Sequence, residues 1–150
     1  MIRDDRGLDD DFQSNEKLFF RCKAEWIDQN GRIRLAHVRA PDQSVNREKF
    51  SKRYDVLLPI DDTSSPKLIY WGVASVDVQD VPTHGVSTGG LIFSFTVEHD
   101  PLENNYGHTE LRAYKNNKRE MKSDNINKAV RKEYRAKLAE RTRIEISPLI

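Results

Sequence analysis

The feature that most constrains this chain is a period-two alternation of apolar and polar residues, which is typical of a β-strand with one buried face. The clearest case runs from residue 91 to 113. On one side of an extended chain it places Leu91, Phe93, Phe95, Val97 and His99, and after a turn Thr109, Leu111 and Ala113. This pattern predicts a β-hairpin whose apolar face needs a covering layer.

Other segments fit the same scheme. The alternation from Leu18 to Trp26 predicts a strand, and Asn30-Gly31 favours a tight hairpin turn, so a second strand is expected over Arg32 to Ala40. Lys67 to Val81 is typical of a long strand bent near Gly72. The segments from Pro41 to Pro59 and from Pro82 to Gly90 lack the alternation and are interpreted as loops.

One helix is predicted from about residue 124 to 141, because apolar residues recur there every four positions: Ile126, Val130, Tyr134 and Leu138. Ser123 or Asn125 is the expected cap. Ile144 to Ile146 then alternates and is expected to return as an edge strand before Pro148. The fold class is therefore α+β: an antiparallel or mixed sheet of about five to six strands with one long C-terminal helix packed on a face.

The length of 150 residues suits one domain with its own core. Residues 1–15 are rich in aspartate and are interpreted as a disordered acidic tail, which leaves 16–150 as a single α+β domain. A lone cysteine, Cys22, excludes an intramolecular disulfide and favours a reducing compartment. No run approaches the ~20 apolar residues of a membrane span, so a cytoplasmic location without membrane contact is expected.

Positive charge is concentrated in two places, although the net charge is only +1. Asn46, Arg47 and Lys49 form the first, and the second is the predicted helix with its approach, from Lys115 to Arg143, where Lys128, Arg131 and Arg135 share one flank. Guanidinium groups bind phosphate bidentately. The leading hypothesis is a small accessory or interaction domain that binds a phosphate-rich partner, nucleic acid or a nucleotide, through these residues. The plainer interpretation is a solvated loop and a surface helix whose cationic stems cover the sheet edge.

The turn between the hairpin strands suggests an alternative function. It carries His99 and His108, which could act as base and acid in a metal-independent hydrolase or nuclease, with Asn105 orienting the scissile group and Arg47 or Arg112 stabilising negative charge. Strand parity opposes this pairing. If Val97 faces Leu111, the two histidines project from opposite faces.

No metal and no cofactor are predicted. His37, His84, His99 and His108 could bind zinc or manganese together with Asp100, Glu103 or Glu110, but no compact ligand motif joins them. Phosphate-binding glycine motifs and nucleophile motifs are absent. A third hypothesis is a protein partner that adds a strand to the edge at Ile144 to Ile146 or to the first hairpin. The sequence does not decide whether the protein is an enzyme, nor its oligomeric state.

Overall fold

The structure, a computed structural model, describes residues 7–34, 37, 43–57, 71–87, 89–115, 118–120 and 126–149. The strands are β1 (Lys17–Cys22), β2 (Gln43–Arg47), β3 (Gly72–Asp77), β4 (His84–Val86), β5 (Ile92–His99), β6 (His108–Lys115), β7 (Lys118–Glu120) and β8 (Arg143–Ile146). The helix is α1 (Lys128–Arg141), and short 3-10 turns are η1 (Ala24–Trp26), η3 (Arg53–Leu57) and η5 (Val78–Asp80).

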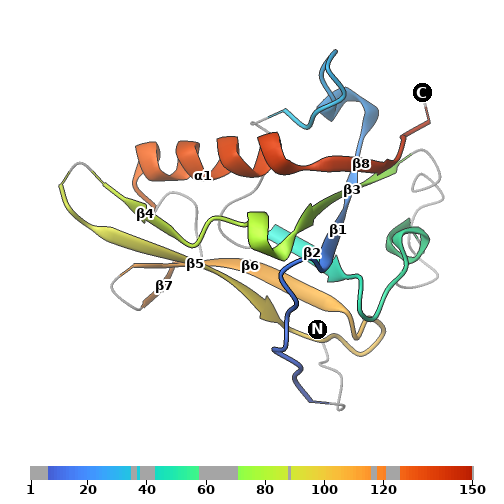
Figure 1. Ribbon diagram of the computed structural model, residues 1–150, viewed down its shortest axis with the longest axis horizontal. Helices are drawn as coiled ribbons and strands as arrows, with labels where there is room; N and C mark the ends of the chain where they lie inside the picture. The colour runs from blue at the N-terminus through green and yellow to red at the C-terminus, as the bar shows by residue number, and fades with distance from the viewer. Residues whose placement is uncertain are drawn as a thin grey trace.

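These strands form one sheet. Seven follow the order β4-β5-β6-β2-β1-β3-β8, and β7 pairs with β6 outside that order. Every pairing between the named strands is antiparallel. The α1 helix lies along one side of the sheet (Figure 1). The predicted α+β architecture with its C-terminal helix is confirmed, whereas the strand number of five to six is wrong, because β2 and β4 form in segments that were expected to be loops.

The predicted hairpin is the longest pair in the sheet. β5 and β6 align Val97 with Leu111 and His99 with Thr109, the register that the parity argument assumed. Phe93 and Phe95 from β5 are buried on the α1 side, where the Phe95 ring lies 4.2 Å from that of Tyr134. The alternation therefore determined which face meets the helix.

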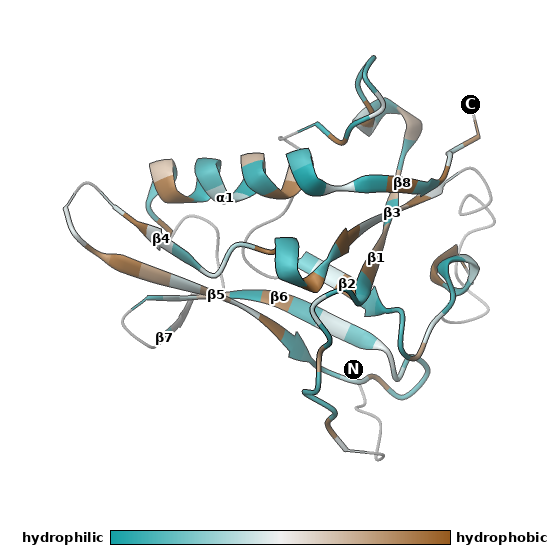
Figure 2. Ribbon diagram, in the orientation of Figure 1, coloured by the Kyte–Doolittle hydropathy of each residue, from teal (hydrophilic) through white to brown (hydrophobic). Residues whose placement is uncertain are grey.

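The helix buries the predicted stripe. Ile126, Val130, Tyr134 and Leu138 are each 3% exposed, and hydrophobic segments alternate with hydrophilic ones along α1 in Figure 2. The cap is Asn127, whose side-chain oxygen accepts hydrogen bonds from the backbone N–H groups of Ala129 and Val130 at 3.0 and 3.2 Å. The two residues predicted to cap it, at positions 123 and 125, lie outside the described residues.

The expected loop at 41–59 contains a central strand instead. β2 lies between β1 and β6, and its inward positions are Val45 and Arg47, 3% and 0% exposed. An arginine at a core position interrupts the apolar pattern by which such a strand is recognised. Burial of Arg47 is possible only because distant residues neutralise it, as described below.

Of the first hairpin, the described residues show the turn. Gly31 has a φ of +75°, and Ile27 and Ile33 form an isolated bridge, so the tight turn is real. However, β1 ends at Cys22 and pairs with β2 and β3, not with the residues after the turn. Residues 35, 36 and 38–40 of the expected second strand lie outside the described residues.

Predictions about the sheet edge, the lone cysteine and membrane spans can also be compared with the structure. The described β8 ends the strand order, so the predicted edge strand at Ile144 to Ile146 is confirmed. Cys22 is buried in the core, and burial raises the pKa of its thiol to about 11. Among the described helices, none has the length and apolar character that crossing a membrane requires.

Candidate functional site

Arg47 is a structural residue in this fold. Its guanidinium, 0% exposed, donates from Nε and Nη2 to the two carboxylate oxygens of Glu16 at 3.1 and 3.0 Å. It also donates to the backbone carbonyls of Asp9 and Asp11, and it lies 3.9 Å from the ring centre of Phe12. These contacts anchor the acidic segment to the sheet, and they occupy the group that was predicted to bind an anion or stabilise negative charge.

Lys49 faces the same acidic segment. Its ammonium lies 2.6 Å from the Asp9 carboxylate, and this bond, with the backbone N–H of Asp11, holds the pKa of Asp9 below its ordinary value. The division of the chain into a tail (1–15) and a domain (16–150) stays a prediction. Within it, the described residues from 9 to 12 make specific contacts with β2 and with β5 that composition did not indicate.

The structure does not bring the two turn histidines together. His99 accepts the backbone N–H of Asp9 at Nδ1 (2.9 Å) and donates from Nε2 to the Tyr106 carbonyl (2.6 Å). His108 donates from Nδ1 to the Asp100 carbonyl at 2.8 Å. Because His99 pairs with Thr109, the neighbouring His108 projects from the other face of the sheet. Each imidazole is held separately by backbone.

His108 belongs to a network of charges on the face opposite α1. Arg112 lies 2.9 Å from both Glu98 and Asp100, and His108 Nε2 lies 3.3 Å from Glu110. Burial alone raises the pKa of Glu98, but hydrogen bonds from Thr96, Tyr114 and Arg112 outweigh it and lower that pKa. Arg112 thus lies between the Glu98 and Asp100 carboxylates and makes a charge-assisted contact with each.

The same network is the one group of three possible metal ligands in the described ranges. Donor atoms of Asp100, His108 and Glu110 all lie within 4.8 Å of one another, and imidazole with carboxylate suits zinc. The Arg112 guanidinium, however, already compensates Asp100. We therefore interpret the group as an ion network. Of the other histidines considered, His37 stacks on Trp26, and His84 lies on β4.

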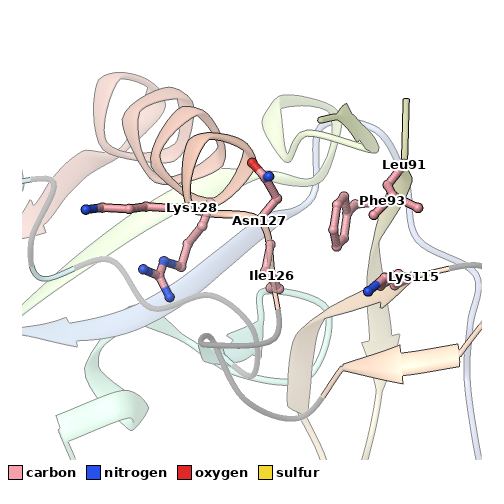
Figure 3. A pocket seen from close by; sticks show the side chains of 7 residues that line it. Leu91, Phe93, Lys115, Ile126, Asn127 and Lys128 are labelled. Carbon is pink, nitrogen blue, oxygen red and sulfur yellow. The ribbon is translucent and has the colours of Figure 1, made fainter. Parts of the chain in front are cut away.

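A cationic pocket opens where α1 begins. It has a volume of about 390 Å³ and is lined by Leu91, Phe93, Lys115, Ile126, Asn127, Lys128 and Arg131. In Figure 3, Lys115 from β6 points toward the start of the helix, and Lys128 extends on the other side of Ile126. The described lining contains three cations and no carboxylate.

Arg135 extends this cationic pocket by one helical turn. Burial and the neighbouring charge of Arg131 both lower the pKa of its guanidinium. Its Nε is buried and has no hydrogen-bond partner in the described part of the chain. Lys118 of β7 is exposed and pairs with Lys115, which brings a further cation to this end of the sheet. Of the predicted helical set, Lys128 and Arg131 line the cationic pocket and Arg135 lies one helical turn beyond it, and the described lining contains none of Asn46, Arg47 and Lys49.

A second pocket, of about 350 Å³, is lined by three of the other predicted residues. Asn46, Asn105 and His108 line this amide pocket together with Trp26, His37 and Trp71. Asn105 Nδ2 donates to Asn46 Oδ1 at 2.8 Å. Neither tryptophan was predicted to belong to a site, because both lie outside regular strands and only the tertiary fold brings them to a pocket that β2 also lines.

Comparison with known proteins adds no relationship: the chain matches no protein-family model, no curated protein and no solved structure.

Proposed function

We propose that this protein binds the phosphate groups of a nucleic acid through the cationic pocket, the residues Lys115, Lys128 and Arg131, with Arg135 and Lys118 beside it. The observation that carries the proposal is the grouping of cations from β6 and α1 around one pocket without a carboxylate in its described lining. Cations so placed repel one another, and a phosphate relieves that repulsion.

The electrostatics of α1 support the same site. The described first turn of α1 contains no acidic residue, so no side chain of that turn opposes an anion at the positive end of the helix dipole. Burial first, and the charge of Arg131 second, lower the pKa of Arg135, so a second guanidinium lies near Arg131 on the helix. An anion at this position interacts favourably with all of these charges.

Binding should be tested by fluorescence anisotropy with a labelled single-stranded oligonucleotide at several salt concentrations. We expect binding that weakens steeply with salt, as phosphate contacts require. The Lys128→Gln/Arg131→Gln double variant should bind more weakly, and its slope of log K against log salt should fall by about 1.4, since each lost contact to a single strand contributes about 0.7.

The matched control is the Lys132→Gln/Lys137→Gln double variant. It removes the same charge from the same helix, but neither residue lines the cationic pocket, and Lys137 pairs with Glu133 at 2.9 Å. We expect the control to bind nearly as the unmodified protein does. No binding at low salt, or equal losses in both double variants, contradicts the proposal.

The alternative functions have less support. A hydrolase that uses His99 and His108 as acid and base requires two imidazoles within reach of one substrate, and the register gives them opposite faces. Strand addition at β8 keeps its structural basis, because β8 ends the described sheet. Neither alternative has a feature comparable with the cationic pocket.

A further inference from the structure

We propose that the amide pocket binds a planar heterocyclic ring that carries hydrogen-bond donors and acceptors along its edge, as a nucleobase does. This ligand class goes beyond phosphate binding, and the amide pocket shares no described lining residue with the cationic pocket. It rests on an aromatic wall, a fixed pair of amides and the size of the space between them.

The aromatic wall comes from three half-buried rings. Trp26 stacks on His37 with ring centres 5.1 Å apart and planes 10° apart, and Trp71 meets Trp26 edge to face at 5.6 Å. Each ring keeps part of its surface accessible within the amide pocket. A flat ligand can stack on the accessible indole and imidazole faces. Such stacking does not depend on which base the ligand contains.

The amide pair provides polar recognition. The bond from Asn105 Nδ2 to Asn46 Oδ1 fixes how both amides are turned. It leaves the Asn46 amino group as a donor and the Asn105 carbonyl as an acceptor, the combination that recognises the edge of a base. Asn46 is held in β2 by pairing with His108 of β6, so this side of the amide pocket is built on the sheet.

The size and surroundings agree with a small flat ligand. A volume of about 350 Å³ is near the lower end of the roughly 300–1,000 Å³ found for small-molecule pockets. Phe19 and Val56 add apolar surface to the lining. On the far side, His108 is held by the Asp100 carbonyl, which orients its ring.

The experiment uses intrinsic fluorescence, because the chain has two tryptophans and both line the amide pocket. The full chain is titrated with adenosine, guanosine, cytidine and uridine, and with ribose as the control ligand. These probes carry no phosphate, so failure here and failure of the phosphate proposal can be told apart. We expect saturable quenching by at least one nucleoside and none by ribose.

Variants then locate the binding. Asn105→Ala should weaken nucleoside binding about tenfold, the loss expected for a paired hydrogen bond in a built site. Asn104→Ala changes an exposed residue of the same turn and should bind normally, as should the Lys128→Gln/Arg131→Gln variant. If circular dichroism shows that Asn105→Ala does not fold, Asn46→Ala replaces it. Absence of saturable quenching with all four nucleosides, or quenching that the amide variants leave unchanged, overturns the inference.

Discussion

Replacement of Arg47 by methionine should destabilise the protein strongly while leaving the cationic pocket intact. The side chains of Arg47 and Glu16 are 0% and 5% exposed, so the variant leaves a carboxylate buried without its cation. Removal of one partner from a buried ion pair costs about 3–5 kcal/mol. Since single domains have about 5–15 kcal/mol of stability, a loss of this size is readily measured.

The assay is urea unfolding followed by tryptophan fluorescence, with the free energy taken from the midpoint and slope. The double variant Arg47→Met/Glu16→Gln should recover much of the loss, because it removes both charges together. Its glutamine keeps an oxygen that can accept the backbone N–H of Lys49, which Glu16 accepts at 3.1 Å.

Lys49→Met is the matched control, because Lys49 is 42% exposed and its ion pair with Asp9 lies at the surface. Exposed pairs contribute up to about 1 kcal/mol, so the control should stay within that range. If Arg47→Met also loses less than about 1 kcal/mol with an unchanged slope, the structural role assigned to Arg47 is wrong.

Three further predictions concern other parts of the fold. The ionised form of Glu98 is favoured in the folded state, so its contribution is present above the ordinary pKa of 4.5 and is lost as pH falls through the lower folded value. The stability difference between the protein and Glu98→Gln, measured in urea, should therefore shrink on acidification, and a gap that widens contradicts this sign. Gly85→Ala should lower the free energy of unfolding by about 1–3 kcal/mol, because a Cβ there would lie 2.5 Å from Cγ1 of Val130. A thermal melting curve that is unchanged in this variant refutes the close contact of β4 with α1. The Cys22 thiol should react with a disulfide reagent only after urea is added, because it is buried and has a pKa of about 11, whereas rapid labelling of the native protein would count against that burial.

The sequence predicted the parts of this fold whose side chains follow a regular period. β5, β6 and α1 each carry an apolar stripe of the right spacing, and the register of Val97 with Leu111 follows from it. The same parity opposed a shared site for His99 and His108, and the register places them on opposite faces of the sheet.

The missed elements depend on contacts between distant residues. β2 carries arginine at a buried position, and its burial depends on Glu16 and on carbonyls of residues 9 and 11. No local pattern in β2 indicates those partners. β4 is a strand of three residues, too short for any alternation to be visible.

In the candidate sites, too, local spacing predicted some residues, and contacts between distant residues determined the others. Helical spacing grouped Lys128, Arg131 and Arg135, and the structure adds Lys115 because β6 ends beside the start of α1. The amide pocket combines Asn46 with Asn105, 59 positions away, and with two tryptophans. Such a combination comes from sheet topology and cannot be read from spacing.

The most direct test of the account is a map of backbone amide signals by nuclear magnetic resonance during titration with a single-stranded oligonucleotide at low and high salt. The account predicts shifts centred on Lys115 and on residues 127–131 that disappear at high salt. Absence of shifts at low salt, or shifts that leave Lys115 and residues 127–131 unaffected, would contradict it.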